Sequence, residues 1–385
     1  MVLKMDITPL NRWIKDGGRP FIISGPCSAE SEEQVIETAR CLAEIKQVRA
    51  FRAGIWKPRT RPGAFEGAGN VALKWLRRVK EETGLLTATE VANEKHVYEA
   101  LKYGIDILWI GARTSVNPFT VQEIADALSG VDVIVFVKNP VNPDIDLWTG
   151  AIERVARAGI KKIGAIHRGF SAFEKTVYRN QPNWQIPIEL RRRIPGLPIL
   201  CDPSHIGGAR KYIFEISQKA MDLNFDGLII ESHINPDKAL SDSAQQITPD
   251  TLKEILCRLV LRSPDPADPR LLDELGELRQ QIDVLDDHLI DLLERRMQIA
   301  DKIGFFKKKN NITVLQSARW DEIISKVIAR GNSKGLSSEL IDTIFKAIHQ
   351  ESINRQIRIV NNGLENNNKE KSKETSDLKD LHNKT

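Results

Sequence analysis

The sequence lacks the features of a secreted, membrane-bound or nucleic-acid-binding protein. No run approaches the roughly 20 consecutive apolar residues that a membrane-spanning helix needs. The four cysteines form no CxxC pair, which excludes common zinc and redox motifs. A net charge of +4 gives no support for binding to nucleic acid. Because the N-terminus also has no apolar leader, we expect a cytoplasmic protein without nucleic-acid or membrane partners.

What the chain does contain is a long series of buried-strand patterns. Its 385 residues predict about two domains. Amphipathic stretches with helical spacing separate most of the eight apolar runs, and this alternation predicts an α/β fold with an all-parallel sheet. Eight units in about 250 residues favour a closed (β/α)8 TIM barrel over residues 1–262 rather than an open doubly wound sheet. The runs lie at 19–25, 50–54, 85–91, 107–112, 133–139, 162–169, 198–203 and 227–232.

The rest of the chain predicts a helical module after a linker. Residues 263–270 are rich in proline and read as a hinge. Apolar residues at alternating spacings of three and four predict one helix over 271–309, followed by helices over 317–330 and 337–359. A helix on the order of 55–60 Å long cannot be buried by a domain over 271–360 alone, so we expect a homodimer through this all-α module. The polar tail, 361–385, is predicted to be disordered.

Polar residues follow every predicted strand, where a barrel carries its active site. Strand 8 closes beside strand 1, so residues from strands 7, 8 and 1 meet, and mixed sulfur, nitrogen and oxygen ligands suit a first-row divalent ion. We therefore predict one divalent metal ion, with Mn2+ favoured and Fe2+, Co2+ or Zn2+ as alternatives. Its ligands would be Cys27, His205, Glu231 and Asp242.

The other strand ends carry mainly cations, with Glu90 and His167 among them. So many buried positive charges without counter-anions would be costly, and they predict anionic, phosphorylated substrates. These cations are Arg52, Lys57, Arg59, Arg113, Lys138 and Arg168.

Residues 1–262 resemble the short subfamily of metal-dependent 3-deoxy-D-arabino-heptulosonate-7-phosphate (DAHP) synthases. The resemblance rests on GPCSAES, FRAGIWKPRTRP, WIGARTSVNP, VKNP, HRG, CDPSH, ESH and SDSAQQ, which occur in this order. It implies condensation of phosphoenolpyruvate with D-erythrose 4-phosphate. The alternative is a barrel like that of the 3-deoxy-manno-octulosonate-8-phosphate synthases, against which KPRT (57–60) argues.

The resemblance also implies a role for each rim residue. Phosphoenolpyruvate would be bound by Arg113 and Arg168 at its phosphate and by Arg52, Lys57 and Lys138 at its carboxylate. Arg59 and Thr60 would bind erythrose 4-phosphate. Glu90 either positions the attacking water or balances the local cations. Ser243 stands where the family has glycine after the metal-binding aspartate.

In the helical module, polar residues occupy positions where the spacing predicts apolar ones. Arg296, Lys307, Ser352 and Gln356 all face inward on this pattern, which indicates either a pocket for a dicarboxylate or a device that sets the coiled-coil register. Residues 272–357 resemble the all-helical chorismate mutases, which implies that chorismate is the substrate and that Arg279 enters the pocket from the partner chain. Arg319 matches a family arginine, whereas Gln316 and Trp320 replace family acids.

Taken together, the two resemblances predict a bifunctional enzyme of aromatic amino acid biosynthesis. A second interpretation makes the helical module a dimerisation and ligand-sensing device without useful turnover. Because the first predicted strand starts at residue 19, we expect no N-terminal regulatory domain. We expect feedback inhibition by prephenate or chorismate to come from the helical module, docking on the barrel.

Overall fold

The computed structural model describes residues 2–13, 19–57, 65–172, 176–263, 269–315 and 317–361, with backbone alone at 269 and 317–319. It divides the chain into two compact units, Met1–Pro264 and Asp265–Thr385. The predicted linker lies largely, and the predicted disordered tail almost entirely, outside the described residues.

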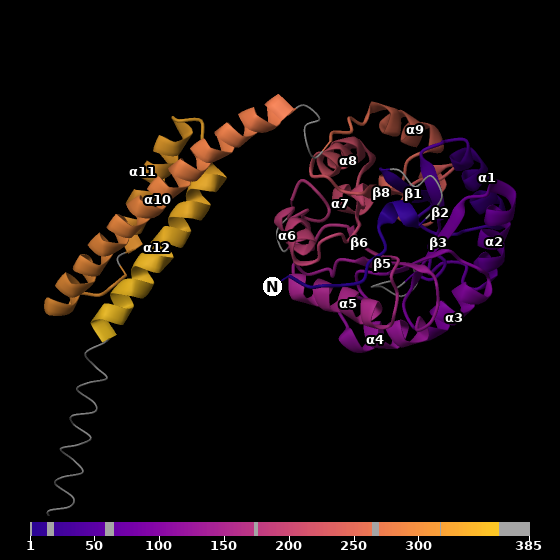
Figure 1. The fold of residues 1–385 in the computed structure, drawn as a ribbon, viewed down its shortest axis with the longest axis horizontal. Helices are drawn as coiled ribbons and strands as arrows, with labels where there is room; N and C mark the ends of the chain where they lie inside the picture. Colours follow the sequence, from indigo (N-terminus) through magenta and orange to yellow (C-terminus); the bar gives the residue numbers. More distant parts are fainter. Residues whose placement is uncertain are drawn as a thin grey trace, which may run out of the picture. The chain divides into compact units, whose positions relative to one another are not determined.

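The first unit is a closed barrel of parallel strands, in which each strand pairs with the next and the last pairs with the first (Figure 1). This confirms the predicted fold class. Each apolar run supplies one strand because β-branched residues buried on both faces suit a parallel sheet. The strands are β1 (Phe21–Gly25), β2 (Val48–Arg52), β3 (Leu86–Val91), β4 (Ile107–Ile110), β5 (Ile134–Lys138), β6 (Ile163–His167), β7 (Ile199–Cys201) and β8 (Gly227–Glu231).

Helices surround the strands, and polar side chains fix where several of them begin (Figure 1). Ser31 accepts a hydrogen bond from the backbone of Gln34, and Asn93 and Asp144 cap their helices in the same way. The helices are α1 (Glu32–Ala43), α2 (Val71–Thr83), α3 (Glu94–Lys102), α4 (Pro118–Ala127), α5 (Ile145–Arg157), α6 (Gln185–Arg193), α7 (Pro203–Gly207), α8 (Ile213–Asp222) and α9 (Pro249–Arg258), with short 3-10 turns at Leu10–Arg12, Arg210–Tyr212, Pro236–Lys238 and Ser243–Gln245.

Alternation along the strands creates two cores. Phe21, Ile23 and Phe136 point into the barrel, where Trp13 packs against Phe136 at a ring distance of 5.5 Å. Ile22 and the other alternate residues face the helices. The barrel interior is therefore filled by side chains, which leaves the carboxyl ends of the strands as the place for chemistry.

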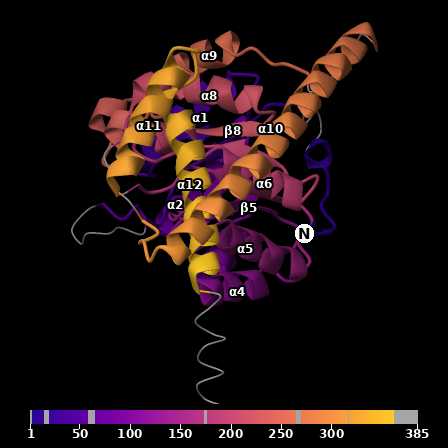
Figure 2. The same ribbon diagram turned by 90° about the vertical axis from the view of Figure 1, so that its left-hand side faces the viewer.

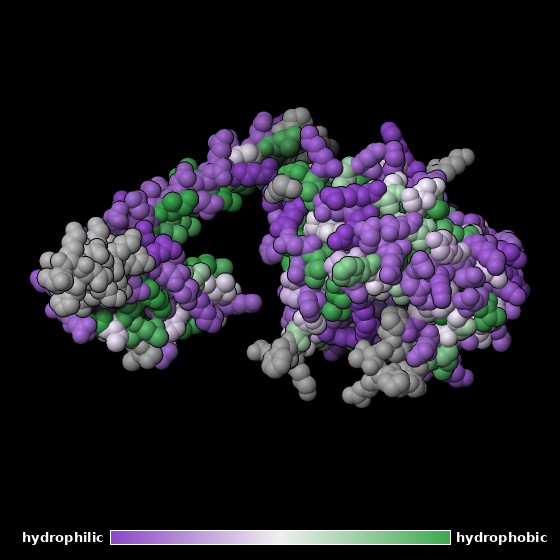
Figure 3. Space-filling view, turned by 90° about the horizontal axis from the view of Figure 1, so that it is seen from below, coloured by the Kyte–Doolittle hydropathy of each residue, from purple (hydrophilic) through white to green (hydrophobic). Residues whose placement is uncertain are grey.

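The second unit consists of α10 (Pro269–Lys309), α11 (Ser317–Asn332) and α12 (Ser338–Asn361). α10 and α12 lie side by side (Figure 2). The first half of α10 exposes large apolar side chains, including Leu278, Ile282, Leu285 and Leu289, and Figure 3 shows hydrophobic side chains on the surface of this unit. None of the described helices has the length and hydropathy of a membrane span.

Candidate active sites

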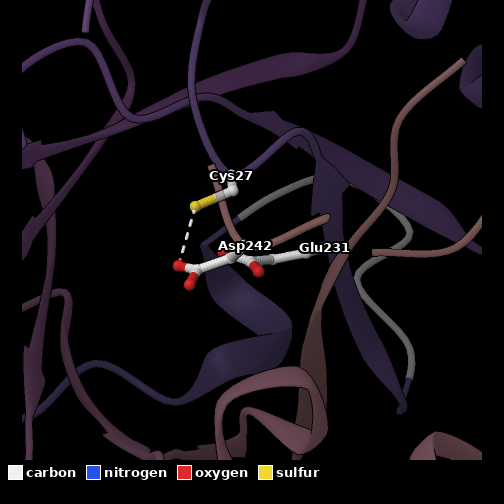
Figure 4. A group of neighbouring side chains, drawn as sticks. All are labelled: Cys27, Glu231 and Asp242. Carbon is white, nitrogen blue, oxygen red and sulfur yellow. Dashed lines mark hydrogen bonds between the residues drawn. The ribbon is translucent and has the colours of Figure 1, made fainter. Parts of the chain in front are cut away.

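Closure of the barrel brings together residues that are distant in sequence. Gly25 of β1 pairs with Glu231 of β8, so Cys27, two residues farther on, lies beside Glu231. Asp242 follows in the loop after β8, and its Oδ2 lies 3.3 Å from Cys27 Sγ. One ligand atom of each of these three residues lies within 4.8 Å of the others (Figure 4). The described residues thus contain a possible metal site.

His205, the fourth predicted ligand, borders this group rather than belonging to it. Its Nδ1 lies 2.8 Å from Asp202, which also caps α7 by accepting from the His205 backbone. This leaves His205 Nε2 3.8 Å from Glu231 Oε1. Burial lowers the pKa of His205, which favours the neutral imidazole that binds metals.

The chemistry of the group fits a divalent cation. Glu231 Oε1 is buried and accepts no hydrogen bond from any described residue, although Arg52 Nη1 lies 3.3 Å away. Burial and the charge of Glu231 raise the pKa of the Cys27 thiol to about 11. Burial alone would raise the pKa of Asp242, but His205 and Arg179 outweigh it and lower that pKa. A cation would satisfy the free carboxylate oxygen and favour the thiolate.

The loop around Asp242 does not need the glycine that the resemblance led us to expect at 243. Asp242 itself has the left-handed conformation, with φ of 47°, and Ser243 begins a 3-10 turn. Aspartate is among the residues that tolerate this conformation best.

The cations of the early strands surround the possible metal site. The buried Arg52 donates from Nη2 to the carbonyl oxygen of Cys27 at 3.1 Å, and Lys57 Nζ lies 3.1 Å from Cys27 Sγ. Lys138 Nζ donates to Asp202 Oδ2 at 3.0 Å. Glu231 and Asp202 therefore balance part of this positive charge within the protein itself.

Arg168 and Arg113 form a second cationic group. Burial, together with the charges of Arg179 and Arg113, lowers the pKa of Arg168 to about 10. Arg168 also donates from Nη1 to Asn180 Oδ1 at 3.0 Å. Two guanidinium groups close enough to repel each other are an arrangement that a phosphate would stabilise. Arg59 and Thr60 lie outside the described residues.

Glu90 lies at the end of β3, where Trp109 Nε1 donates to its carboxylate at 2.9 Å. A Cβ atom at Gly111 would lie 2.2 Å from Glu90 Oε1, so glycine leaves the space that this side chain fills.

His167, in contrast, does not face the barrel mouth. It is fully buried, and its ring centroid lies 5.3 Å from that of Trp184 and 5.7 Å from that of Phe170. Its inclusion in the polar ring was wrong, because Ile166 points into the barrel and the next residue of a strand points to the opposite face.

A pocket in the helical unit collects the predicted inward-facing polar residues. Arg296, Lys307, Ser352 and Gln356 line it. Arg296 Nη1 donates to Ser352 Oγ at 2.6 Å, and Lys307 Nζ to the carbonyl oxygen of Val314 at 2.6 Å. Burial lowers the pKa of both Arg296 and Lys307.

The pocket also contains a residue that the sequence analysis missed. His349 stacks on Trp320 with ring centroids 3.9 Å apart, and both rings line the pocket. The signal was available, because His349 precedes Ser352 by three residues and Gln356 by seven, spacings that place all three on one helix face. Burial, with the charges of Arg296 and Lys307, lowers the pKa of His349.

Three predicted residues of this half are not seen in the pocket. Gln316 and the side chain of Arg319 lie outside the described parts of the structure. Arg279 is exposed in the first half of α10 and does not line the pocket of its own chain.

Comparison with known proteins identifies relatives of both units. Residues 6–263 match the model of the DAHP synthetase I family, and residues 278–357 match that of chorismate mutase type II. The chain is 34% identical over 244 residues to a phospho-2-dehydro-3-deoxyheptonate aldolase of Thermotoga maritima, covering 63% of this chain and 70% of the relative.

Two further similarities concern the barrel. A 2-dehydro-3-deoxyphosphooctonate aldolase of Syntrophotalea carbinolica is 29% identical over 258 residues, covering 62% of this chain and 90% of the relative. The crystal structure of the phospho-2-dehydro-3-deoxyheptonate aldolase (DAHP synthase) from Thermotoga maritima superposes with a TM-score of 0.58 at 32% identity, covering 66% of this chain and 71% of the other.

Proposed function

Since the chain belongs to the DAHP synthetase I family and continues into a chorismate mutase, it is a bifunctional enzyme, and we propose how its residues carry the two reactions. The barrel joins phosphoenolpyruvate to D-erythrose 4-phosphate, and the helical unit rearranges chorismate to prephenate. Both reactions belong to the biosynthesis of aromatic amino acids.

In the barrel, C3 of phosphoenolpyruvate bonds to the aldehyde carbon of the sugar phosphate while the aldehyde oxygen takes a proton. Water adds at C2, the bond from C2 to the phosphate oxygen breaks, and a ketone and inorganic phosphate remain. Arg168 and Arg113 hold the phosphate, and Arg52, Lys57 and Lys138 hold the carboxylate and fix the attacked face. Arg59 and Thr60 bind the sugar phosphate, and Glu90 either positions the water or balances the cations.

The observation that carries this proposal is the convergence of Cys27, Glu231 and Asp242 beside His205. These four residues would hold a divalent ion, which when bound supplies Lewis-acid polarisation of the aldehyde oxygen. We favour Mn2+, with Fe2+, Co2+ and Zn2+ as alternatives that suit the mixed donor set. All four cysteines are free, and a cytoplasmic location would keep Cys27 reduced.

The barrel reaction can be tested by phosphate release. Purified protein should release phosphate only with both phosphorylated substrates and a divalent metal, and a chelator or Cys27→Ala should abolish it. Arabinose 5-phosphate in place of erythrose 4-phosphate should not support turnover. If phosphate is released with arabinose 5-phosphate but not with erythrose 4-phosphate, the barrel instead carries out the octulosonate reaction suggested by the more distant relatives.

In the helical unit, chorismate would bind with its carboxylates at Arg296 and at Arg279 of a second copy. The rearrangement needs no nucleophile, and its transition state gathers negative charge on the ether oxygen, where Lys307 and Gln356 donate. Ser352 would lie near a carboxylate of chorismate. Gln316 and Arg319 would contribute to the pocket from the middle of the three helices. The exposed apolar face of the first half of α10 supports the homodimer.

A mixing experiment tests the shared site. Arg279→Ala and Arg296→Ala should each abolish chorismate consumption. Refolded together in equal amounts, they should recover about a quarter of wild-type activity, because half of the dimers are mixed and each has one intact site. Mixtures that stay inactive would contradict the shared pocket. If the wild-type protein consumes no chorismate, the helical unit is a sensor.

We also propose that prephenate or chorismate, bound in the helical pocket, inhibits the barrel. The support is that the helical pocket, which we propose binds chorismate and prephenate, lies on the same polypeptide as the barrel that carries the first reaction. Phosphate release by the full chain should fall when prephenate is added, whereas residues 1–263 alone should be insensitive. Equal inhibition of both proteins would place the effector site on the barrel.

A further inference from the structure

The loop after β6 contains two consecutive residues that touch both halves of the barrel site. The backbone N–H groups of Arg179 and Asn180 donate to the carbonyl oxygens of Gly207 and Ile206, at 3.3 and 3.1 Å. These carbonyls belong to α7, the helix that carries His205. Gly208 has φ of +67°, and a Cβ there would lie 2.4 Å from that of Arg179, so loop and helix end are in close contact.

Asn180 connects the predicted phosphate site to the predicted metal site. Its Oδ1 accepts from Arg168 Nη1 at 3.0 Å, and its Nδ2 donates to the carbonyl oxygen of His205 at 2.6 Å. The side chain is buried. One amide therefore links the guanidinium of Arg168, a predicted phosphate ligand, to the backbone of His205, a predicted metal ligand.

Arg179 is connected to both carboxylates of the predicted metal site, directly to Asp242 and through Gln245 to Glu231. Its Nη1 donates to Asp242 Oδ1 at 3.0 Å and to Gln245 Oε1 at 2.8 Å. Gln245, which is buried, donates from Nε2 to Glu231 Oε2 at 2.7 Å. One oxygen of each carboxylate, Asp242 Oδ1 and Glu231 Oε2, thus accepts a hydrogen bond from Arg179 or Gln245. The other oxygens are directed differently: Asp242 Oδ2 faces Cys27, and Glu231 Oε1 accepts no hydrogen bond from any described residue.

We propose that Arg179, Asn180 and Gln245 are positioning residues that orient the carboxylate ligands of the metal and couple metal binding to phosphate binding. This inference rests on the proposed metal site. We assign none of the three residues a contact with the reacting atoms. They act through Asp242 and Glu231 on one side and through Arg168 and His205 on the other. Partners of this kind are worth about 10–100-fold in metal affinity.

The alternative is that Arg179 only holds a loop in place. Arg210 provides the comparison, because it donates to the backbone carbonyls of Gln246 and Ser243 in the same loop but is not bonded to either carboxylate. A second comparison is Arg40, whose exposed pair with Glu82 lies away from the site. Arg40→Met removes one positive charge, as does Arg179→Met.

The experiment is a titration of the metal-free full-length protein with Co2+ alone, followed by the thiolate-to-cobalt absorption band. The wild type should show the band and Cys27→Ala should not. Arg179→Met should weaken Co2+ binding about 10–100-fold, whereas Arg210→Met and Arg40→Met should change it much less. Gln245→Met should resemble Arg179→Met, and the double variant should be no weaker than the worse single variant, because both belong to one relay.

Asn180→Ala tests the coupling. Phosphoenolpyruvate should tighten Co2+ binding to the wild type, and by linkage Co2+ should tighten phosphoenolpyruvate binding by the same factor. In Asn180→Ala, phosphoenolpyruvate should hardly change the affinity for Co2+, and Co2+ should hardly change the affinity for phosphoenolpyruvate.

The outcomes distinguish a failure of the metal site from a failure of the positioning role. If the wild type shows no Cys27-dependent band, the metal site itself is wrong and the inference falls with it. If the band is present but Arg179→Met binds Co2+ as tightly as the wild type, or no more weakly than Arg210→Met, the positioning role is overturned. Coupling that persists in Asn180→Ala overturns the link between the two sites.

Discussion

Replacing the buried His167 with phenylalanine should make the stability of the barrel less sensitive to acid. The imidazole is fully buried and lies against Trp148, Phe170, Trp184 and Phe225. Burial, and then the charge of Arg168, lowers its pKa from 6.5 to about 3. The folded protein therefore keeps this side chain neutral over a pH range in which the unfolded chain protonates it.

The direction and size of the effect follow from this difference. Because the unfolded state binds more protons below about pH 6.5, stability falls with falling pH until about pH 3, where the folded state also takes up the proton. Between about pH 8 and pH 5, one such histidine costs about 2 kcal/mol. This value depends almost entirely on the unfolded pKa, so it holds for any folded pKa well below 5. Solvent does not screen a fully buried group.

The measurement is urea unfolding of the metal-free protein at about pH 8 and pH 5. The barrel transition is recognised by its larger m value, since the barrel exposes more surface than the helical unit. His167→Phe should lose about 2 kcal/mol less than the wild type between the two pH values. His288→Gln, at an exposed position on α10, should behave as the wild type does. Equal losses in His167→Phe and the wild type would refute the buried neutral imidazole as the cause.

Three further substitutions test the helical pocket and the barrel core. Gln356→Leu should lower chorismate turnover about 10²–10³-fold, because it removes a donor to the developing charge, while phosphate release by the barrel is unchanged. Trp320→Leu removes the ring stacked on His349 and should raise the KM for chorismate about 2- to 10-fold, with a smaller change in kcat. Phe136→Ala leaves a cavity inside the barrel and should cost about 3–5 kcal/mol in urea unfolding.

Strand positions and ring closure could be predicted because the sequence signal for both is strong. Continuous apolar runs mark buried parallel strands, and a closed ring makes the first and last strands neighbours. Ring closure alone predicted that Cys27 lies beside Glu231, and the pairing of Gly25 with Glu231 confirms it. His167 was misplaced because the last residue of a strand can face either the barrel interior or the surrounding helices. The HRG motif does not show which; this follows only from the alternation along the strand, in which Ile166 faces inward.

The outer contacts of the barrel site could not be predicted, because no periodic pattern connects them. Arg179 lies in an irregular loop, and its partners Asp242 and Gln245 are 63 and 66 residues away. Asp202 is different. It precedes His205 by three residues, a spacing typical of a helix cap, so its bond to the imidazole could have been expected.

The two units differ in how much of a site one chain can complete, and the difference follows from topology. A closed barrel returns the end of the sheet to its beginning, so every group of the predicted metal site is supplied within one copy. The helical unit has no such closure. Arg279 precedes Arg296 by 17 residues, about 26 Å along α10, which is far longer than an arginine side chain. If Arg279 binds chorismate, it does so in another copy, and the exposed apolar residues between the two arginines are then the surface over which that copy packs.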